Sequence, residues 1–535
     1  MLRAVLVALT MVLSSLGTAA LASGEEVFAR GEFEVHAGTV ADHAEAREKL
    51  GEQGDFIAIQ LGADTWFAVV YGTEEYPNSI HMRSWQLRYL GGATVVGPDG
   101  GVIAPETPLP VVRVSGQALP LLLEFHDSGY ESTKFGMGKN VGGGNGLFDF
   151  QPRPGFYGVG ILERNGMHHH EPAMKMVDLN TAWTPVFNPE SDVSIDTENR
   201  TVEVSFGLTA RNLPYIYVDE EQPEIPEVLE EVTITFRLTV SLVEKTIEVP
   251  WYRVTVSRDG VEASERDGER TFSGRAVESH LKYDHYLEGW DYRERGEDSR
   301  LMLLTFTFFA TFVPNQAAQW MSQQFIDQHL SDGAGRAEFE TDYEIDQQTG
   351  EERHFAPGPD DEDGEDGRPD KHGKMKYRAR EAFENRVQRL RTNSIEFHDN
   401  WDRAGKLTWV SNVSVTVDGN VTEEPLYHQL HAMESVQSFM GWENPDRLRE
   451  LRSDGHVSGI VLLGGYVYPA GNALLHDPTF EVSALLAEIG TGLQTLLAKL
   501  GLLQLAELAA VTVLAIALPF WRSHSPSAAA AARCC

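Results

Sequence analysis

The chain has 535 residues, enough for roughly two to four domains, and 42% of them are hydrophobic, enough for a substantial core. The formal net charge of −36 argues against nucleic acid or an anionic membrane surface as a partner. The two cysteines, Cys534 and Cys535, end the chain, so no disulfide, zinc finger, iron–sulfur site or cysteine nucleophile can form upstream of them.

Residues 1–22 have the pattern of a secretory signal peptide. Arg3 supplies the basic start, an apolar stretch follows, and Ala20-Leu21-Ala22 forms an A-x-A cleavage pattern. The alternatives are an uncleaved anchor and a core helix. We expect cleavage before Ser23 and export of the remaining chain.

Apolar residues that recur with a period of two predict a mainly β protein. Residues 202–208 and 232–242 alternate strictly, and residues 409–417 do so with one exception. Residues 301–313 are apolar or Thr throughout and too short for a membrane span, so they predict a central strand buried on both sides. Further strands are expected at residues 56–60, 66–71, 85–90, 111–114, 121–126, 157–163, 247–257, 280–290 and 459–467, with a bulge or edge at Pro250.

Few helices are expected. Apolar spacing predicts them at residues 41–53, 315–330 and 374–391, and Asn444-Pro445 marks the start of a short one. Residues 374–391 carry the clearest amphipathic stripe, which includes Met375, Phe383 and Leu390.

The expected fold is a large antiparallel β-sandwich ectodomain with a few inserted helices, plus one C-terminal transmembrane helix. The predicted organisation is a signal peptide (1–22), an N-terminal β-rich domain (23–190), a central β-sandwich (191–345), an acidic loop rich in Gly and Pro (346–372), a helix with a C-terminal β region (373–481), a juxtamembrane and transmembrane helix (482–521) and a short cytoplasmic tail (522–535).

The sharpest candidate for chemistry is the run His168-His169-His170-Glu171, with methionines on both sides. Imidazole and thioether groups suit copper, and imidazole with carboxylate suits zinc. In an extended segment His168 and His170 share one side, and Glu171 or a distant residue such as Asp178 or His126 would complete the site. The alternative is an exposed polar turn between strands.

Other sequence signals for chemistry are weaker. His428, His431 and Glu434 have the spacing of a helical metal-binding face. The glycine-rich residues 136–146 lack dinucleotide-binding spacing and indicate a hairpin loop. The sequence contains no G-x-S-x-G, H-E-x-x-H, P-loop or C-x-x-C-H motif, and its carboxylates are too numerous to single out an acid–base pair. Catalytic residues are therefore unknown, and copper or zinc is the only cofactor considered.

Three N-glycosylation sequons begin at Asn199, Asn412 and Asn420, all in settings that can face solvent. Chance occurrence of these triplets and their use as glycosylation sites are equally good explanations.

Acidic residues outnumber basic ones by 80 to 44, and Lys is scarce, at 11 against 33 Arg. This composition is typical of a protein that works in concentrated salt, where charge repulsion is screened. An ordinary acidic secreted protein is the alternative.

Residues 500–521 are a candidate membrane anchor. They contain one charged residue, Glu507. Trp521 ends the span and Arg522 follows it, at the positions where an interfacial aromatic residue and a positive charge on the inner side of the membrane are expected. The alternative is a buried or interfacial amphipathic helix. With the signal peptide, this span predicts a single-pass type I protein of the cell membrane, with an extracellular ectodomain.

The leading hypothesis is a membrane-anchored cell-surface β-sandwich protein for adhesion, envelope structure or ligand binding, which we expect not to be an enzyme. One rival is an anchored extracellular hydrolase that acts on glycans or esters. Another is an extracellular copper- or zinc-binding protein that uses the segment His168-His169-His170. The sequence identifies no extracellular ligand.

Overall fold

The computed structural model describes residues 25–30, 33–50, 53–62, 65–126, 158–162, 168–172, 174–217, 227–257, 260–293, 299–318, 321, 336–341, 343–345, 352–354, 375–378, 389–390, 393–398, 403–437, 449, 452–453 and 455–485. Strands make up most of these residues, and nearly all of them pair antiparallel in one large sheet. The described helices are few and short. The prediction of a mainly β, antiparallel fold is therefore confirmed.

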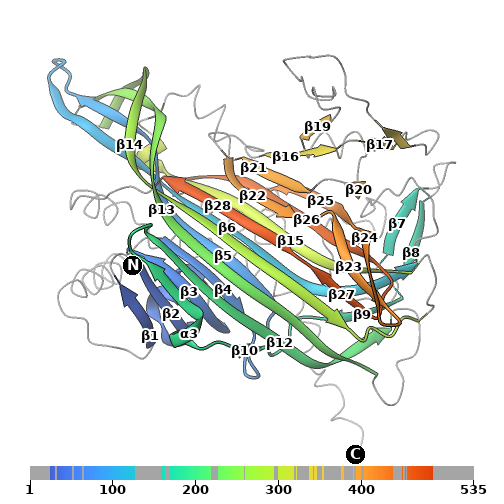
Figure 1. The fold of residues 1–535 in the computed structure, drawn as a ribbon. Helices are drawn as coiled ribbons and strands as arrows, with labels where there is room; N and C mark the ends of the chain where they lie inside the picture. The colour runs from blue at the N-terminus through green and yellow to red at the C-terminus, as the bar shows by residue number, and fades with distance from the viewer. Residues whose placement is uncertain are drawn as a thin grey trace, which may run out of the picture.

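The large sheet folds into two layers, of which the first begins at the N-terminus (Figure 1). Its strands pair in the order β1 (Glu25–Arg30), β2 (Phe33–Thr39), β3 (Asp55–Leu61), β4 (Thr65–Tyr71), β5 (Ile80–Val96), β6 (Val102–His126), β15 (Ser299–Pro314), β26 (Gly455–Pro469), β25 (Tyr427–Ser435) and β20 (Arg389–Leu390). Strands β1 to β6 form a meander, and strands from later in the chain extend it.

The second layer is built around two long strands, β13 (Val228–Ser257) and β14 (Gly260–Glu288). On one side β13 pairs with β12 (Thr201–Tyr217), which in turn pairs with β10 (Thr184–Val186) and β11 (Val193–Asp196). On the other side β14 pairs with β27 (Ala473–His476) and β28 (Pro478–Leu485). The layer continues through β22 (Arg403–Trp409), β21 (Ser394–His398), β16 (Arg336–Thr341) and β19 (Met375–Arg378), and through β23 (Asn412–Val417) and β24 (Asn420–Pro425).

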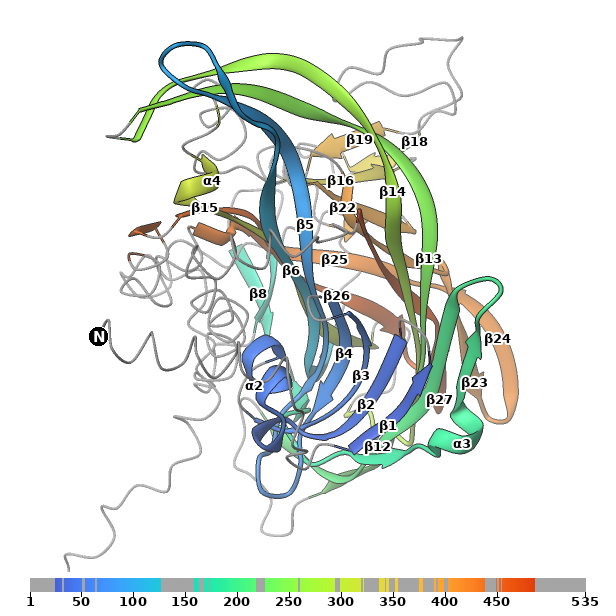
Figure 2. The same cartoon turned by 90° about the vertical axis from the view of Figure 1, so that its left-hand side faces the viewer.

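Two pairings join the layers. Strand β9 (Lys175–Asp178) pairs with β6 of the first layer and with β12 of the second. Farther along, Trp251–Thr255 of β13 pairs parallel with Gly92–Val96 of β5. Figure 2 shows the hairpins β5–β6 and β13–β14 arching together above the rest of the sheet. The layers are therefore hydrogen-bonded to each other as well as packed face to face.

The remaining described elements are small. They are the two-stranded sheets β7 (Gly158–Leu162) with β8 (His168–Pro172) and β17 (Tyr343–Ile345) with β18 (Glu352–His354), and the helices η1 (Val40–Asp42), α2 (Ala44–Leu50), α3 (Pro189–Asp192) and α4 (Asn315–Ala318). Helix α3 begins where the Asn188 side chain accepts a hydrogen bond from the Glu190 amide, with Pro189 at the first helical position.

The apolar faces of the two layers form an inner core. Period-two alternation places Val204, Phe236 and Tyr283 of the second layer against Val35, Phe67 and Met82 of the first. Each of these side chains is at most 4% exposed. Burial of this apolar surface is the main source of stability for the arrangement.

The other face of the first layer is also apolar and forms an outer core. Trp66, Trp85, Phe306, Phe308 and Val461 belong to it, and helix α2 adds Ala46 and Leu50. Strand β15 contributes alternate residues to both cores, and Leu303 and Leu304 are each at most 5% exposed. The prediction of a central strand buried on both sides is confirmed.

Local sequence features shape the sheet at two places, of which the irregularity at Pro250 was predicted. The register between β13 and β14 shifts between Pro250 and Tyr252, because proline cannot donate a ladder hydrogen bond. Asp418 and Gly419, both with positive φ of 49° and 82°, form the turn between β23 and β24.

Several predicted elements differ from the structure. The helix predicted at residues 374–391 is wrong where it can be compared, because Met375–Arg378 and Arg389–Leu390 are strands that pair with β16 and β25. The helix predicted at 315–330 is observed as Asn315–Ala318, and that predicted at 41–53 as Ala44–Leu50. Residues 111–114 and 121–126 belong to one strand, and residues 410–411 interrupt the strand predicted at 409–417.

Several predicted features lie outside the described residues. These are the signal peptide, the glycine-rich residues 136–146, most of the acidic loop, the helix at Asn444-Pro445 and the candidate anchor at 500–521. Within the part of the chain that is described, no helix has both the length and the apolar composition needed to cross a membrane.

Candidate functional site

Strand β5 carries a charged side chain into the outer core. Met82 belongs to the inner core and Trp85 to the outer core, so the period of two places Arg83 on the outer side of the first layer. Arg83 is only 5% exposed. Charged side chains are almost never buried to this extent unless they are paired.

The row of residues beside Arg83 is made of small side chains. Arg83 lies opposite Ala68 of β4 and Gly116 of β6, and Gly116 lies opposite Phe308 of β15. A Cβ atom on Gly116 would lie 2.8 Å from Cε1 of Phe308 and 2.8 Å from the Met82 carbonyl oxygen. The missing side chain therefore lets Phe308 pack closely over β6, in the same row as Arg83.

No acidic group among the described residues neutralises Arg83. Its Nε and Nη1 atoms are buried without a hydrogen-bond partner in this part of the chain. Burial lowers the pKa of the guanidinium to about 9, so the group is still charged at neutral pH. A buried charge without a partner is strongly unfavourable.

A second buried titratable side chain, that of His81, brings no negative charge to Arg83. His81 lies two residues before Arg83 on the same side of β5 and is 2% exposed. Burial, and then the charge of Arg83, lower the pKa of His81 well below its usual value. The ring is held by Ser79 Oγ at 3.0 Å and Asn78 Oδ1 at 3.1 Å from its Nε2. The arrangement can therefore accept an anion, and a planar guanidinium suits a carboxylate or phosphate.

A second polar group, here called the inner polar cluster, lies between the layers. It consists of Gln117 (β6), Tyr283 and His285 (β14), Thr307 (β15), Tyr466 and Tyr468 (β26) and His476 (β27). Each of these residues is at most 1% exposed. Strand pairing brings together side chains that are far apart in the sequence.

Hydrogen bonds connect one half of the inner polar cluster across the two layers. The Tyr283 hydroxyl donates to Gln117 Oε1 at 2.5 Å, and Gln117 Nε2 donates to Thr307 Oγ1 at 3.0 Å. The hydroxyls of Tyr283 and Tyr466 are 3.3 Å apart. This half is a satisfied network that fixes how the layers face each other.

The other half of the cluster is a triangle of three polar atoms. His285 Nε2 is 2.5 Å from the Tyr468 hydroxyl and 3.2 Å from His476 Nδ1, and the hydroxyl is 3.1 Å from His476 Nδ1. Burial lowers the pKa of His285 to about 3. Burial, and then His285, lower the pKa of His476 well below its usual value. Both imidazoles are therefore neutral at physiological pH.

A third buried group surrounds Lys175 of β9. Its Nζ lies 4.0 Å from the ring centre of Tyr215 and 5.7 Å from that of Trp290, and it donates to the Asp291 carbonyl. Nearby, Glu124 accepts hydrogen bonds from Trp290 Nε1 and the Arg293 amide, both at 2.9 Å. Burial raises the pKa of Glu124 and lowers that of Lys175. Its polar contacts are internal, so we interpret this group as a structural link between β6, β9 and the segment after β14.

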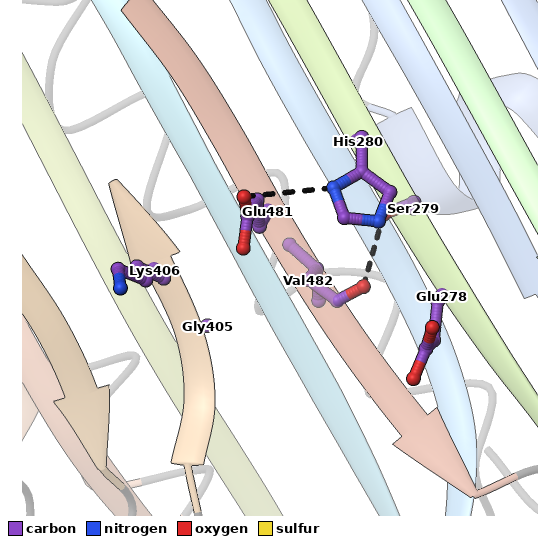
Figure 3. A pocket seen from close by; sticks show the side chains of 7 residues that line it. All are labelled: Glu278, Ser279, His280, Gly405, Lys406, Glu481 and Val482. Carbon is purple, nitrogen blue, oxygen red and sulfur yellow. Dashed lines mark hydrogen bonds and ion pairs between the residues drawn. The ribbon is translucent and has the colours of Figure 1, made fainter. Parts of the chain in front are cut away.

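The outer face of the second layer has a small hollow of about 80 Å³ (Figure 3). Glu278, His280, Lys406 and Glu481 line it, and His280 Nδ1 lies 3.6 Å from Glu481 Oε1. Its lining contains no aromatic ring other than the imidazole. The hollow thus lacks the stacking platform that the predicted glycan hydrolase would need.

The predicted metal ligands are only partly placed. His168, His170 and Glu171 lie in β8, so the segment is extended as the sequence argument requires, but their side chains, like that of His126, are outside the described set. Asp178 accepts hydrogen bonds from Asn180. Among the described residues, no group of three or more His, Cys, Asp or Glu side chains is arranged to hold a metal.

The second predicted metal set, His428 with His431 and Glu434, is wrong in its helical geometry. These residues belong to strand β25, so their spacing does not give one face. His428 is fully buried and stacks on Trp409 with ring centres 4.9 Å apart.

All three sequon asparagines are exposed. Asn199 lies in the turn before β12, where its side-chain amide donates to Asp196 at 2.6 Å, and Asn412 and Asn420 begin β23 and β24. The exposure that glycosylation requires is therefore present, and use of these sites stays a prediction.

Sequence reasoning missed both Arg83 and the inner polar cluster. The one available signal for Arg83 is a basic residue near the start of β5, between the large apolar residues Met82 and Trp85. For the cluster no local signal exists, because His285 and His476 are 191 positions apart. Neither known protein families nor curated proteins offer further guidance, since none of them matches this chain in sequence.

Proposed function

We propose that this chain is a membrane-anchored extracellular β-sandwich protein that binds an anionic amphiphile, a molecule with a carboxylate or phosphate head and an apolar tail. The observation that carries the proposal is Arg83, a buried guanidinium without a counter-ion among the described residues. Ligand binding was one of the three roles that the sequence favoured.

The head group is inferred from the charge of the site. A guanidinium that is 5% exposed loses most of its hydration, and a bound anion would replace that hydration with charge-assisted hydrogen bonds. His81 cannot supply the negative charge, because its imidazole is either neutral or positive. The missing partner is therefore an anion, whose oxygen atoms would accept hydrogen bonds from the guanidinium.

The tail is inferred from the surroundings of Arg83. The outer core around it is lined by large apolar side chains, including Trp66, Trp85 and Phe308. Binding sites for small molecules are typically apolar with a few well-placed polar groups. Since Arg83 is so little exposed, we expect the ligand to be enclosed and to exchange slowly.

The location of the protein is inferred from the sequence alone. Residues 1–22 and 500–521 support export and anchoring, and the excess of acidic residues supports an environment of high salt. A protein held at the outer surface of a membrane would meet amphiphiles that leave that membrane.

The test compares a matched set of probes on the full-length chain kept in amphipol. Decanoate has the head and the tail, acetate has the head only, and decan-1-ol has the tail without the charge. Decanoate should raise the melting temperature most, and Arg83→Met should abolish its advantage over decan-1-ol.

The control variant is Arg211→Met, which removes an exposed arginine from β12 that pairs with Glu231 at 2.8 Å. It should respond to decanoate as the wild type does. Equal stabilisation of the wild type and Arg83→Met by decanoate would refute the proposal.

A further inference from the structure

The three polar atoms of His285, His476 and Tyr468 meet where strands β14, β27 and β26 come together. The pairing of β14 with β27 places His285 directly opposite His476. Tyr468 reaches the same point from β26 of the other layer. The cluster is therefore held by both layers, which gives its geometry little freedom.

The distances in this triangle are close to those within a metal coordination sphere. Ligand atoms about 2.0–2.1 Å from one ion lie about 2.9–3.4 Å apart when the angle between them is between square and tetrahedral. The two distances to His476 Nδ1 are 3.1 and 3.2 Å, and the third, 2.5 Å, is shorter. The two imidazole centres are 5.0 Å apart with their planes at 78°, so the rings approach one point without stacking.

Hydrogen bonds do not satisfy the outer ring nitrogen of His476. Its Nε2 atom is buried and has no hydrogen-bond partner among the described residues. Nδ1 faces the triangle, where a lone pair on this atom would serve as a ligand.

Hydrogen bonds alone do not satisfy the other imidazole. His285 Nδ1 is fully buried and has no hydrogen-bond partner among the described residues. If the proton is on Nε2, Nδ1 is a buried acceptor without a donor. If both imidazoles carry their protons on the outer nitrogens, the lone pairs of His285 Nε2 and His476 Nδ1 face each other across 3.2 Å, an opposition that a cation between them would remove.

We propose that His285 Nε2, His476 Nδ1 and the Tyr468 oxygen form a site for one divalent transition-metal ion, of the copper(II) or zinc(II) class. Imidazole nitrogen and phenolate oxygen are suitable ligands for both ions. Tyr468 would bind as the phenolate and release its proton to solvent as the ion enters. The site is separate from the segment His168-His169-His170 and from Arg83.

The experiment uses the full-length chain in which His168 and His170 are both replaced by alanine, so that weak binding by that segment does not contribute. The chain is unfolded, refolded with Cu²⁺ or Zn²⁺ alone, and freed of loose metal before its metal content is measured. We expect one equivalent of metal per chain, a higher melting temperature than after refolding without metal, and a phenolate-to-copper charge-transfer band in the visible spectrum.

Three variants separate ligation from folding. His285→Ala should lose the bound metal. Tyr468→Phe keeps the aromatic ring, so it should stay folded while it loses the charge-transfer band and binds copper at least tenfold more weakly. His428→Ala removes an equally buried imidazole that stacks on Trp409, and it should keep one equivalent of metal with the same spectrum.

Two results would overturn the proposal. One is the absence of stoichiometric metal in a chain that refolds with native circular dichroism. The other is one bound equivalent whose spectrum and affinity are the same in Tyr468→Phe as in the parent.

Discussion

Tyr283 donates a hydrogen bond of 2.5 Å to Gln117 across the inner core, although the two residues are 166 positions apart in the sequence. Tyr283 belongs to β14 of the second layer and Gln117 to β6 of the first. Both side chains are at most 1% exposed. Because the surrounding residues are apolar, this bond and its continuation to Thr307 allow only one relative position of the two layers to satisfy the buried polar groups.

Replacing Tyr283 by phenylalanine should therefore lower the free energy of unfolding by about 1–3 kcal/mol, because Gln117 Oε1 is left buried without its donor. Tyr286→Phe is the matched control on the same strand. Its hydroxyl bonds Glu288 at 2.7 Å and its side chain is 40% exposed, so the change should be within about 0.5 kcal/mol. Denaturant unfolding of the purified variants measures both values, and equal effects would contradict this role of Tyr283.

Arg83→Met should make the ligand-free protein more stable, by about 1–4 kcal/mol, because an uncompensated buried charge is replaced by an apolar side chain of similar length. Arg211→Met, which replaces an exposed side chain of β12, should change the stability by less than about 0.5 kcal/mol. Thermal or denaturant unfolding gives the comparison. A loss of stability in Arg83→Met would mean that the guanidinium has an anionic partner within the protein.

Stability should fall on acidification through the effect of His81. Burial and Arg83 hold the pKa of this imidazole well below its unfolded value of about 6.5. Its contribution is therefore fully present above pH 6.5. It is lost as the pH falls, by about 1.4 kcal/mol per pH unit, because the unfolded chain binds a proton that the folded chain does not.

His81→Asn tests this effect, since it removes the titrating group. The free energy of unfolding, measured from pH 7 to pH 5, should fall less steeply in the variant than in the wild type. The two slopes should differ by up to about 1.4 kcal/mol per pH unit, the value for one proton. Parallel curves over that range would show that His81 is protonated in the folded protein as readily as in the unfolded one.

Gly116→Ala should destabilise the fold by about 1–3 kcal/mol. The added Cβ would lie 2.8 Å from the Met82 carbonyl oxygen, which is backbone and cannot move freely, and 2.8 Å from the Phe308 ring. Gly207→Ala in β12 is the control, because the nearest atom to its Cβ would be 3.8 Å away. The two melting temperatures should differ clearly, and equal values would show that β6 can shift to accept the methyl group.

Salt should stabilise the protein. The net charge of −36 produces repulsion that is strong at 0.1 M salt and largely screened near 2 M, where the Debye length is below about 3 Å. We expect the melting temperature to rise over this range in chloride. A parallel series in sulfate at equal ionic strength separates screening from the effect of the anion on apolar burial. A flat curve in chloride would remove the argument for a salt-adapted protein.

The strands could be predicted from the sequence because alternation acts locally. Residues 232–242 alternate strictly, and each apolar side chain among them is in the inner core. The apolar run at 301–313 predicted a strand that is buried on both faces, and both faces of β15 are buried. The helix predicted at 374–391 failed because its spacing was the only signal, whereas pairing of Met375–Arg378 with β16 depends on a distant segment.

The candidate sites could not be predicted for the same reason. Arg83 is unusual only because β4, β6 and β15 enclose it, and the sequence does not say which strands will be its neighbours. His285 and His476 are directly opposite each other only because β14 pairs with β27. Periodicity shows which side of a strand a residue faces, while site chemistry depends on the register between strands.

The position of the last strands has a consequence for how the chain reaches its folded state during synthesis. Strand β15 needs β26 as its second neighbour, and β14 needs β27 and β28, so both layers keep an open edge until residues 455–485 are available. Nascent chains released before that point would expose unpaired strands and apolar surface, which favours aggregation and binding by chaperones. Expressed fragments that end after Leu485 should accumulate, whereas fragments that end before Gly455 should be degraded, because Phe480 and Val482 of β28 are part of the inner core.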